Sequence, residues 1–446
     1  MVCAIDPNDV GRYGPWVKNK FNKSLSRVTA VRPGGDRGLS RTRREPGFKP
    51  SQHRDWQSER GPYEPACPHY PHCVGCPLIN IPYAEQLIRK RALVARALAA
   101  YPLLSHIEVS AVTASPHRLG YRARVKLVVR SSRGEIATGL YVPGTHRVID
   151  ISSCPVHPRP VNQVLHYLKN KIVELQIEPY DERVDSGQLR YLDFRYSFAQ
   201  RELSVTLVTR HREFPQGGSL ARSLGRKFSF ISGVIQNVNP HRGNVIWGEH
   251  YRVISGRDTL LEQVGSLKLC FPAGAFSQAN PSTAKKLYDG VAEMAALNGR
   301  ETVLDLYCGV GPISLYLAGA ARLIWGIDDS AVSIATAKQN ARRNGISNCR
   351  FFQGDAAVKV ADAEKTLGTI DIIVLNPPRK GVQPAAMEAV LAVNAARIVY
   401  VSCDPKSLAR DIDRLLNHGY RMARLQPFDM FPQTEQVETV ALLVKP

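Results

Sequence analysis

The chain has 446 residues, which is enough for two or three domains that each bury a core of their own. Its 59 lysines and arginines against 39 aspartates and glutamates give a formal net charge of +20, which indicates a polyanionic partner and favours nucleic acid. No run of about 18 apolar residues is present to span a bilayer. No charged-then-apolar leader opens the chain, so we expect a cytoplasmic protein without a membrane partner or an obligate protein partner.

The N-terminal part combines a basic segment with a cysteine cluster. Residues 1–60 show little periodicity and predict a disordered basic arm. Cys67, Cys73 and Cys76 follow in a C-x5-C-x2-C pattern whose thiolates can converge on one centre, and Cys154 is the best candidate for the fourth ligand. This spacing does not separate zinc from a [4Fe-4S] cluster, and it is not the C-x3-C-x2-C pattern of radical S-adenosylmethionine enzymes.

The next segment changes from helical to strand periodicity. Residues 84–100 predict a helix with a basic face, and alternating strands between about residues 107 and 267 predict a small antiparallel β domain. Four cations share one face of a strand, namely Arg122, Arg124, Lys126 and Arg130. That face could bind phosphates, and a merely solvated basic face is the alternative.

The stretch from Thr302 to Asp328 has the pattern of a nucleoside-binding βαβ unit. A buried strand breaks at Cys308-Gly309-Val310-Gly311 before a helix, and a second strand ends at Asp328, about twenty residues on, where a carboxylate can bind a ribose diol. Ser314 takes the third glycine position of the dinucleotide fingerprint, and Asp305 suits an ammonium better than a pyrophosphate. The pattern resembles the S-adenosylmethionine site of class I methyltransferases, with another nucleotide as the alternative.

Alternation of strands and helices continues to the end of the chain and predicts a doubly wound α/β sheet. Ligands of such sheets bind beyond the carboxyl ends of the strands. The residues expected there are Asp305, Asp328, Asp355, Asn376 and Cys403.

Cys403 indicates methylation of a carbon atom. It follows a strand and precedes a helix, a position that favours thiolate. The C5 atom of uracil attacks a sulfonium methyl group only after a thiolate has added to C6, and a base must then remove the C5 proton. Glu438, at the start of the last strand, is the best candidate for that base. A buried structural cysteine is the alternative for Cys403.

Six ordered motifs between about Tyr63 and the C-terminus resemble those of the RNA uridine C5-methyltransferase family. They are Cys67-x5-Cys73-x2-Cys76, Phe276-Ser-Gln278-Ala-Asn280, Asp305-Leu-Tyr307-Cys-Gly309-Val-Gly311, Asn376-Pro-Pro-Arg-Lys-Gly381, Val401-Ser-Cys403-Asp-Pro405, and Asp429-Met-Phe-Pro432 through Gln436-Val-Glu438. The resemblance implies an iron-sulfur and RNA-binding domain over residues 61–267 and a methyltransferase domain over residues 268–446. It implies a [4Fe-4S] cluster on Cys67, Cys73, Cys76 and Cys154, cofactor contacts at Gln278, Tyr307, Asp328, Asp355 and Asn376, nucleophile Cys403 and base Glu438.

Three positions depart from the pattern of many members, which carry Asn at Pro312, Asp at Asn376 and His at Gln436. Asn376 before Pro-Pro-Arg resembles the branch that modifies 23S ribosomal RNA, and so does the cysteine cluster. We therefore expect C5-methylation of a uridine in 23S rRNA, with tRNA as the alternative substrate. Two rivals from other classes are an iron-sulfur oxidoreductase and a non-catalytic RNA-binding protein.

Overall fold

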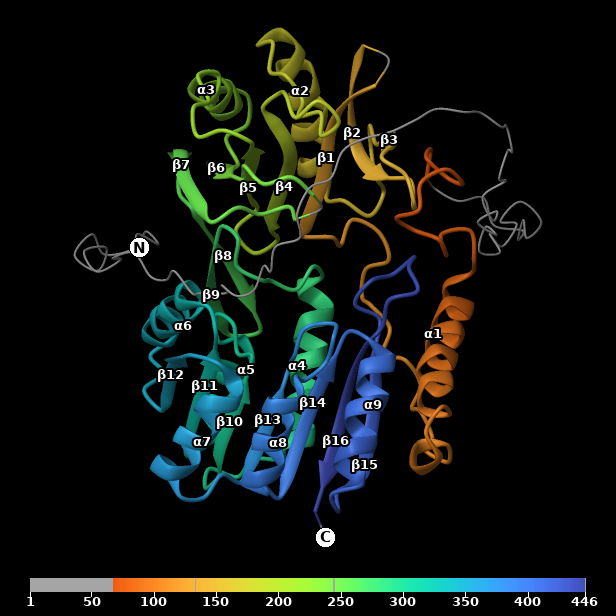
Figure 1. The fold of residues 1–446 in the computed structure, drawn as a ribbon, viewed down its shortest axis with the longest axis vertical. Helices are drawn as coiled ribbons and strands as arrows, with labels where there is room; N and C mark the ends of the chain where they lie inside the picture. The colour runs from red at the N-terminus through yellow and green to blue at the C-terminus, as the bar shows by residue number, and fades with distance from the viewer. Residues whose placement is uncertain (1–66, 133, 244, 446) are drawn as a thin grey trace, which may run out of the picture. The chain divides into compact units, whose positions relative to one another are not determined.

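The computed structural model describes residues 67–445 apart from residues 133 and 244. The described part contains two seven-stranded sheets and a two-stranded hairpin (Figure 1). The expected basic arm, residues 1–60, lies outside the described residues. None of the described helices is both long and apolar enough to cross a bilayer.

The first sheet has the strand order β3-β2-β1-β4-β5-β6-β7. Its strands are β1 (Arg124–Ser132), β2 (Glu135–Tyr141), β3 (Val148–Asp150), β4 (Leu189–Ser197), β5 (Glu202–Thr209), β6 (Ile231–Val238) and β7 (His250–Gly256). Neighbouring strands run antiparallel except β5 and β6, which run parallel. The expectation of an antiparallel sheet is therefore wrong at this pair, because helix α3 (Gly217–Lys227) carries the chain back across the sheet and returns it in the same direction.

Helices α2 (Arg159–Glu174) and α3 cover one face of this sheet (Figure 1). Leu165 and Leu168 of α2, together with Leu220 and Leu224 of α3, pack on inward-facing strand residues such as Phe194 and are fully buried. The strand pattern in the sequence did not reveal these two helices. Since both helices use this face, the cations Arg124 and Lys126 of β1 lie on the other one.

The second sheet has the strand order β12-β11-β10-β13-β14-β16-β15. Its strands are β10 (Thr302–Leu306), β11 (Leu323–Asp328), β12 (Cys349–Gln353), β13 (Ile372–Leu375), β14 (Arg397–Ser402), β15 (Arg421–Phe428) and β16 (Glu438–Val444). The first five run parallel, and β16 enters antiparallel between β14 and β15. The chain reverses direction across the sheet between β10 and β13, so this is the doubly wound α/β fold expected from the sequence.

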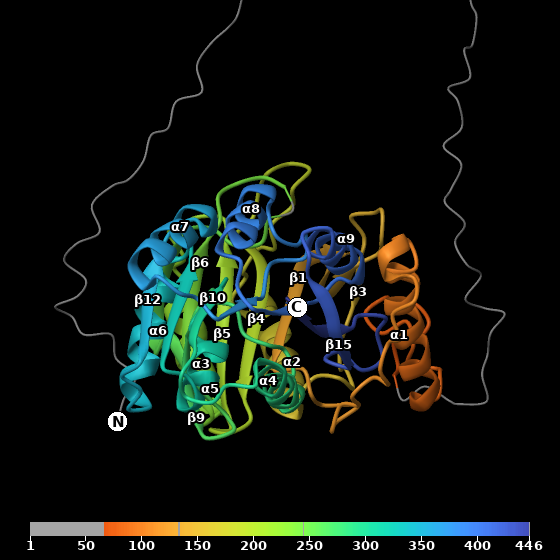
Figure 2. The same ribbon diagram turned by 90° about the horizontal axis from the view of Figure 1, so that it is seen from below.

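Helices cover both faces of this second sheet (Figure 2). One face carries α4 (Pro281–Ala295), α5 (Pro312–Leu317) and α6 (Ala331–Arg343), and the other carries α7 (Ala356–Leu367), α8 (Pro384–Val393) and α9 (Pro405–Leu416). Helix α1 (Tyr83–Leu98) joins the second group, since its Val94 and Leu98 belong to the same core as Leu408 and Ile412 of α9. A hairpin of β8 (Thr259–Val264) and β9 (Leu267–Pro272) spans residues 267 and 268, where the sequence predicts the domain boundary. That boundary stays a prediction.

Helix α1 is joined to the C-terminal part of the chain by a fully buried ion pair. The Lys90 ammonium donates to the Asp429 carboxylate, and neither side chain is exposed. Burial lowers the pKa of Lys90 although the Asp429 charge opposes this shift. Lys90 also donates to the carbonyl oxygen of Phe431 at 2.9 Å, and the Tyr83 hydroxyl donates to Asp429 at 2.7 Å. This polar cluster is satisfied on every side, which a buried charge requires.

We expect Lys90→Met to lower the free energy of unfolding by about 3–5 kcal/mol, because it leaves the Asp429 carboxylate buried without its counter-ion. Arg89→Met on the same helix is the matched control, since its pair with Glu85 is exposed and an exposed pair contributes about 0.3–0.5 kcal/mol. Urea unfolding followed by circular dichroism measures both variants. Equal losses in the two would contradict the assignment of Lys90 to a buried pair.

Candidate active site

Four of the five expected cofactor residues lie at the carboxyl edge of the second sheet. Tyr307 follows β10, Asp328 ends β11, Asp355 follows β12 and Asn376 follows β13. Burial is the main cause that raises the pKa of the Tyr307 hydroxyl, and the charge of Asp355 is the second. These two side chains therefore lie near each other. The parallel strands therefore bring residues that are up to 69 positions apart to one edge, as the sequence predicted.

The glycine turn between β10 and α5 is held by Asp328. One carboxylate oxygen of Asp328 accepts from the Gly309 amide at 2.9 Å, and the other accepts from Ser330 at 3.0 Å. Gly309 and Gly311 have φ values of 56° and 83°, which favour glycine. A Cβ atom added to Gly309 would meet no heavy atom within 4 Å, so open space lies in front of the turn. A nucleoside cofactor fits this arrangement of turn, carboxylate and space.

Asp305 is not placed as the sequence analysis expected. Its side chain is fully buried and accepts from the Ser314 hydroxyl at 2.5 Å, and burial raises its pKa to about 7. The expectation that this acid faces an ammonium group is wrong, because the carboxyl group is fully buried and ties strand β10 to helix α5 through Ser314. The polar residue at the third glycine position, Ser314, is the partner that explains this placement.

Gln278, which precedes helix α4, lines a cavity of about 510 Å³, which we call the central cavity. Cys403, Glu438, Arg379 and Gln436 line the same cavity. Strand β14 pairs with β16 at Ser402 and Thr439. Continuing that antiparallel register by one residue sets Cys403 opposite Glu438, at the spacing of directly facing side chains. The expected nucleophile and the expected base therefore share one cavity.

Burial and charge tune both of these groups. Burial raises the pKa of Glu438 to about 7, and the Arg379 guanidinium opposes the shift. Burial, followed by the negative charge of Glu438, raises the pKa of the Cys403 thiol to about 11, and Arg379 again opposes it. Arg379 follows the Asn-Pro-Pro segment, and the sequence analysis gave it no role. Its effect on both groups shows that it lies close to them.

The expectation that Cys403 is a thiolate is wrong, because the structure raises the pKa of this thiol. Helix α9 does begin just after Cys403, but its N-cap residue is Asp404. The Asp404 carboxylate accepts from the amides of Lys406 at 2.9 Å and Ser407 at 2.8 Å. Burial is the main cause of the raised pKa, and the charge of Asp404, whose carboxylate accepts from free amide donors at the helix start, adds a smaller contribution in the same direction.

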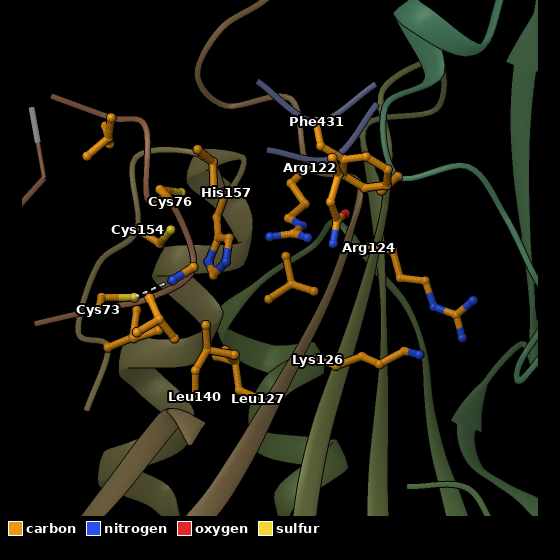
Figure 3. Close-up of a pocket in the computed structure, with 18 of the residues that line it drawn as sticks. Cys73, Cys76, Arg122, Arg124, Lys126, Leu127, Leu140, Cys154, His157 and Phe431 are labelled. Atoms are coloured by element: carbon orange, nitrogen blue, oxygen red, sulfur yellow. Dashed lines mark hydrogen bonds between the residues drawn. The ribbon is translucent and has the colours of Figure 1, made fainter. Parts of the chain in front are cut away.

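The four cysteines of the expected cluster line the central cavity as well. Figure 3 shows Cys73, Cys76 and Cys154 on one side of it, with His157 between them and Arg122. The charges of Cys154, Cys73 and Cys67 contribute to the pKa of Cys76, which burial raises to about 12. In the described part of the chain, no three histidine, cysteine, aspartate or glutamate side chains are placed to hold a single metal ion.

Three of the four cations predicted to share a face of β1 reach the central cavity. Arg122, Arg124 and Lys126 line its wall (Figure 3). Arg130 instead donates to the carbonyl oxygen of Tyr180 at 2.7 Å and lines another cavity. Burial and the neighbouring Arg124 lower the pKa of Lys126 to about 8. With Arg379, the central cavity has four basic side chains against the one carboxylate of Glu438, which suits an anionic ligand.

Comparison with known proteins agrees with this site. A family model described as tRNA (uracil-5-)-methyltransferase matches residues 82–446. An uncharacterized RNA methyltransferase of Geobacter sulfurreducens is 40% identical over 382 residues, which cover 86% of this chain and 77% of that protein. Another from Halalkalibacterium halodurans is 34% identical over 427 residues, covering 95% and 92%.

A solved structure has a similar fold over most of the chain. It is the Pyrococcus abyssi tRNA (uracil-54, C5)-methyltransferase in complex with S-adenosyl-L-homocysteine, which is 28% identical, has a TM-score of 0.68 and is matched over 84% of this chain and 86% of that one. The family model spans more than half of the chain, and the relatives are matched over most of their length. The chain therefore belongs to the RNA (uracil-5-)-methyltransferase family.

Proposed function

We propose that this protein transfers a methyl group from S-adenosylmethionine to C5 of a uridine in 23S rRNA, through a covalent adduct between Cys403 and uracil C6. The observation that supports it is the presence of Cys403 and Glu438 in one cavity, opposite each other across β14 and β16. S-adenosylmethionine supplies the electrophilic methyl group. Tyr307, Asp328, Asp355 and Asn376 bind it at the carboxyl edge of the sheet, and Gln278 binds it from the central cavity.

The reaction needs each of the two groups for one step. The Cys403 sulfur adds to C6, and the electron pair of the C5–C6 double bond moves toward O4 as an enolate. The C5 atom then attacks the methyl carbon, whose bond to sulfur breaks. Glu438 takes the C5 proton, the double bond re-forms, and the bond between Cys403 and C6 breaks to release the thiolate. The balance is one methyl group gained and one proton lost by uracil.

The cavities agree with an RNA strand that passes the thiol. A second cavity of about 540 Å³ shares Cys403, Arg379 and Gln436 with the central cavity. Two further cations, Arg96 and Lys406, line its wall together with the acidic residues Asp404 and Glu435. The target uracil must leave its stack to reach Cys403, which costs a few kcal/mol unless it lies in a loop. A looped uridine is therefore the expected target, with its flanking phosphates near these cations.

The cysteine ligand set supports a [4Fe-4S] cluster in this proposal. Cys67, Cys73, Cys76 and Cys154 are four thiols at one end of the central cavity, and Cys73 accepts a hydrogen bond from the Gly75 amide at 3.4 Å. Four-iron clusters take four thiolates as ligands, and backbone amides commonly donate to their sulfurs. A cluster spreads its ligands around a larger body than a single ion, which agrees with thiols that line a cavity together.

The pH dependence of adduct formation tests the role of Cys403. The folded protein raises the thiol pKa to about 11, so the thiolate fraction is small at neutral pH. As long as the pH stays below that pKa, each unit by which the pH is raised increases the thiolate fraction roughly tenfold. We expect the single-turnover rate of adduct formation to rise throughout the range from about pH 6 to pH 9. Rapid quench into denaturant measures it. A plateau above neutral pH would show that the thiol ionises far more easily than its surroundings imply.

The substrate is tested with labelled S-adenosylmethionine and separate pools of unmodified 23S rRNA and tRNA. The protein is purified anaerobically, and its iron and acid-labile sulfide are measured on the same preparation. We expect label in 5-methyluridine of the 23S rRNA pool, identified by mass spectrometry. Label in tRNA alone would overturn the substrate while retaining the chemistry, and label in neither pool would favour a non-catalytic RNA-binding protein. Bound nicotinamide or flavin would favour an oxidoreductase.

A further inference from the structure

The loop between β15 and β16 delivers Glu438 to the central cavity. It spans residues 429–437, which we call the base loop, and it also contributes Phe431 and Gln436 to the cavity wall. Its residue Asp429 is fully buried and Gln433 is 7% exposed. A loop this well covered is fixed by specific contacts, and those contacts decide where the Glu438 carboxylate lies.

The backbone of the base loop is strained at Gln433. This residue has a φ of 71°, in the left-handed region that few residues other than glycine adopt. Strain of this kind persists only where surrounding contacts hold it, and it is common at functional sites. Four hydrogen bonds hold Gln433 in place, one of them from its Nε2 atom to the carbonyl oxygen of Arg118 at 3.4 Å. Its amide donates to Gln86 Oε1 at 3.0 Å, its side-chain oxygen accepts from Gln86 Nε2 at 2.8 Å, and its carbonyl accepts from the Leu78 amide at 3.0 Å.

Gln86 joins the base loop to the start of helix α1. Its Nε2 atom also points to the carbonyl oxygens of Leu78 at 3.0 Å and Ile81 at 2.9 Å, and the side chain is 1% exposed. Tyr83 and Lys90 lie on the same face of α1, at helical spacing from Gln86, and bind Asp429 at the other end of the loop. One face of α1 therefore grips the base loop at its first residue, Asp429, and at its middle residue, Gln433.

We propose that Gln86 is a positioning residue for proton removal, because it fixes the strained base loop that sets the Glu438 carboxylate against the C5 proton. The proposal rests on the proposed function and adds a residue that touches neither RNA nor cofactor. Loss of the grip releases the loop that leads directly into Glu438, the first residue of β16, whereas Cys403 follows β14 and none of the hydrogen bonds of Gln86 reaches it. The addition and methyl-transfer steps then continue while the removal of the C5 proton slows.

The chain offers a matched control in Gln236 of the first sheet. Gln236 is also fully buried, and its Nε2 atom donates to Thr209 Oγ1 at 2.7 Å and to two backbone carbonyls at 3.1 Å. Replacing either glutamine with leucine removes a buried amide of the same size together with the hydrogen bonds that it makes. Of these two glutamines, Gln86 is the one that contacts the base loop. A general loss of stability therefore affects both variants, and a loss of positioning affects one.

The experiment uses full-length protein with RNA that carries tritium at C5 of the uridines, in the presence of S-adenosylmethionine. Tritium release reports proton removal, and a denaturing gel reports the covalent adduct between protein and RNA. For Gln86→Leu we expect release to slow on the order of 10²-fold, the effect of a displacement of about 1 Å, while the adduct persists. For Gln236→Leu we expect the release rate and the adduct level of the wild type.

The outcomes separate this inference from the proposed function. Glu438→Gln is measured beside the two variants. If Glu438→Gln keeps a persistent adduct while Gln86→Leu releases tritium at the normal rate, the positioning role of Gln86 alone is overturned. Absence of adduct in Glu438→Gln overturns the proposed function and this inference with it. If Gln86→Leu does not fold, Tyr83→Phe removes a single hydroxyl from the same grip. Retention of adduct is expected there too, and normal release in a folded Tyr83→Phe contradicts the inference.

Discussion

Cys403→Ala is expected to abolish methyl transfer, with a loss on the order of 10⁴-fold or more in single-turnover rate. Without the sulfur no adduct forms at C6, and the C5 atom stays too weak a nucleophile to take the methyl group. Binding of S-adenosylmethionine should be unchanged, because four of its five proposed contacts lie at the carboxyl edge of β10 to β13. Isothermal titration measures the binding, and transfer of labelled methyl groups measures the rate.

Cys349→Ala is the matched control for this variant. Cys349 is a buried cysteine of β12 whose thiol lies 3.7 Å from the carbonyl oxygen of Ser314. It packs in the core and touches neither the central cavity nor the base loop. This variant should lose a little stability and keep its methyl transfer. If Cys403→Ala kept its activity as well, a different nucleophile or a reaction without an adduct would have to replace the mechanism proposed here.

The second sheet could be predicted almost entirely from the sequence. Its strands are apolar runs that end in polar residues, and short loops join them to helices with clear periodicity, so each boundary has a local signal. The strand, glycine turn, helix and second strand predicted between Thr302 and Asp328 agree with β10, α5 and β11. The expected placement of Asp328, Asp355 and Asn376 follows from the same rule about the carboxyl ends of parallel strands.

The first sheet was harder to predict because its order depends on contacts between distant residues. The apolar stripes of α2 and α3 have helical spacing, as in Val161, Val164, Leu165, Leu168 and Ile172 of α2, and this local signal was missed among the strand patterns around it. The parallel pair β5 and β6 gives no local signal, since a strand has the same pattern in either direction. The alternating strand pattern therefore predicted a β domain and could not predict that its sheet is mixed.

The candidate site was predicted in its residues and only partly in its chemistry. Local sequence placed Cys403 before a helix and indicated an ionised thiol. The structure reverses that expectation, because burial, and after it the charge of Glu438 on another strand, raises the pKa of this thiol. The roles of Arg379 and Gln86 also depend on tertiary contacts. Gln86 is 347 residues from Gln433 in the sequence, and no spacing rule could relate the two.

Glu438→Gln is expected to trap the covalent adduct between Cys403 and the RNA. The glutamine side chain has the size and shape of the glutamate but accepts no proton, so the reaction stops after methyl transfer, with the C5 proton and the bond to C6 both in place. A denaturing gel should show a band in which protein and RNA migrate together. The methylated form of this adduct should appear only when S-adenosylmethionine is present. Digestion and mass spectrometry should locate the link at Cys403.

Glu438→Gln also changes the charge around the Cys403 thiol, in addition to removing the base. The Glu438 charge is the largest charge effect that raises the pKa of the Cys403 thiol, and Arg379 opposes it. Glutamine removes that negative charge, so the thiol of the variant should ionise at lower pH and the adduct should form at least as fast as in the wild type. Slow formation with no trapped product would contradict both roles assigned to Glu438. Fast formation with slow decay would place the carboxylate at proton removal and at no earlier step.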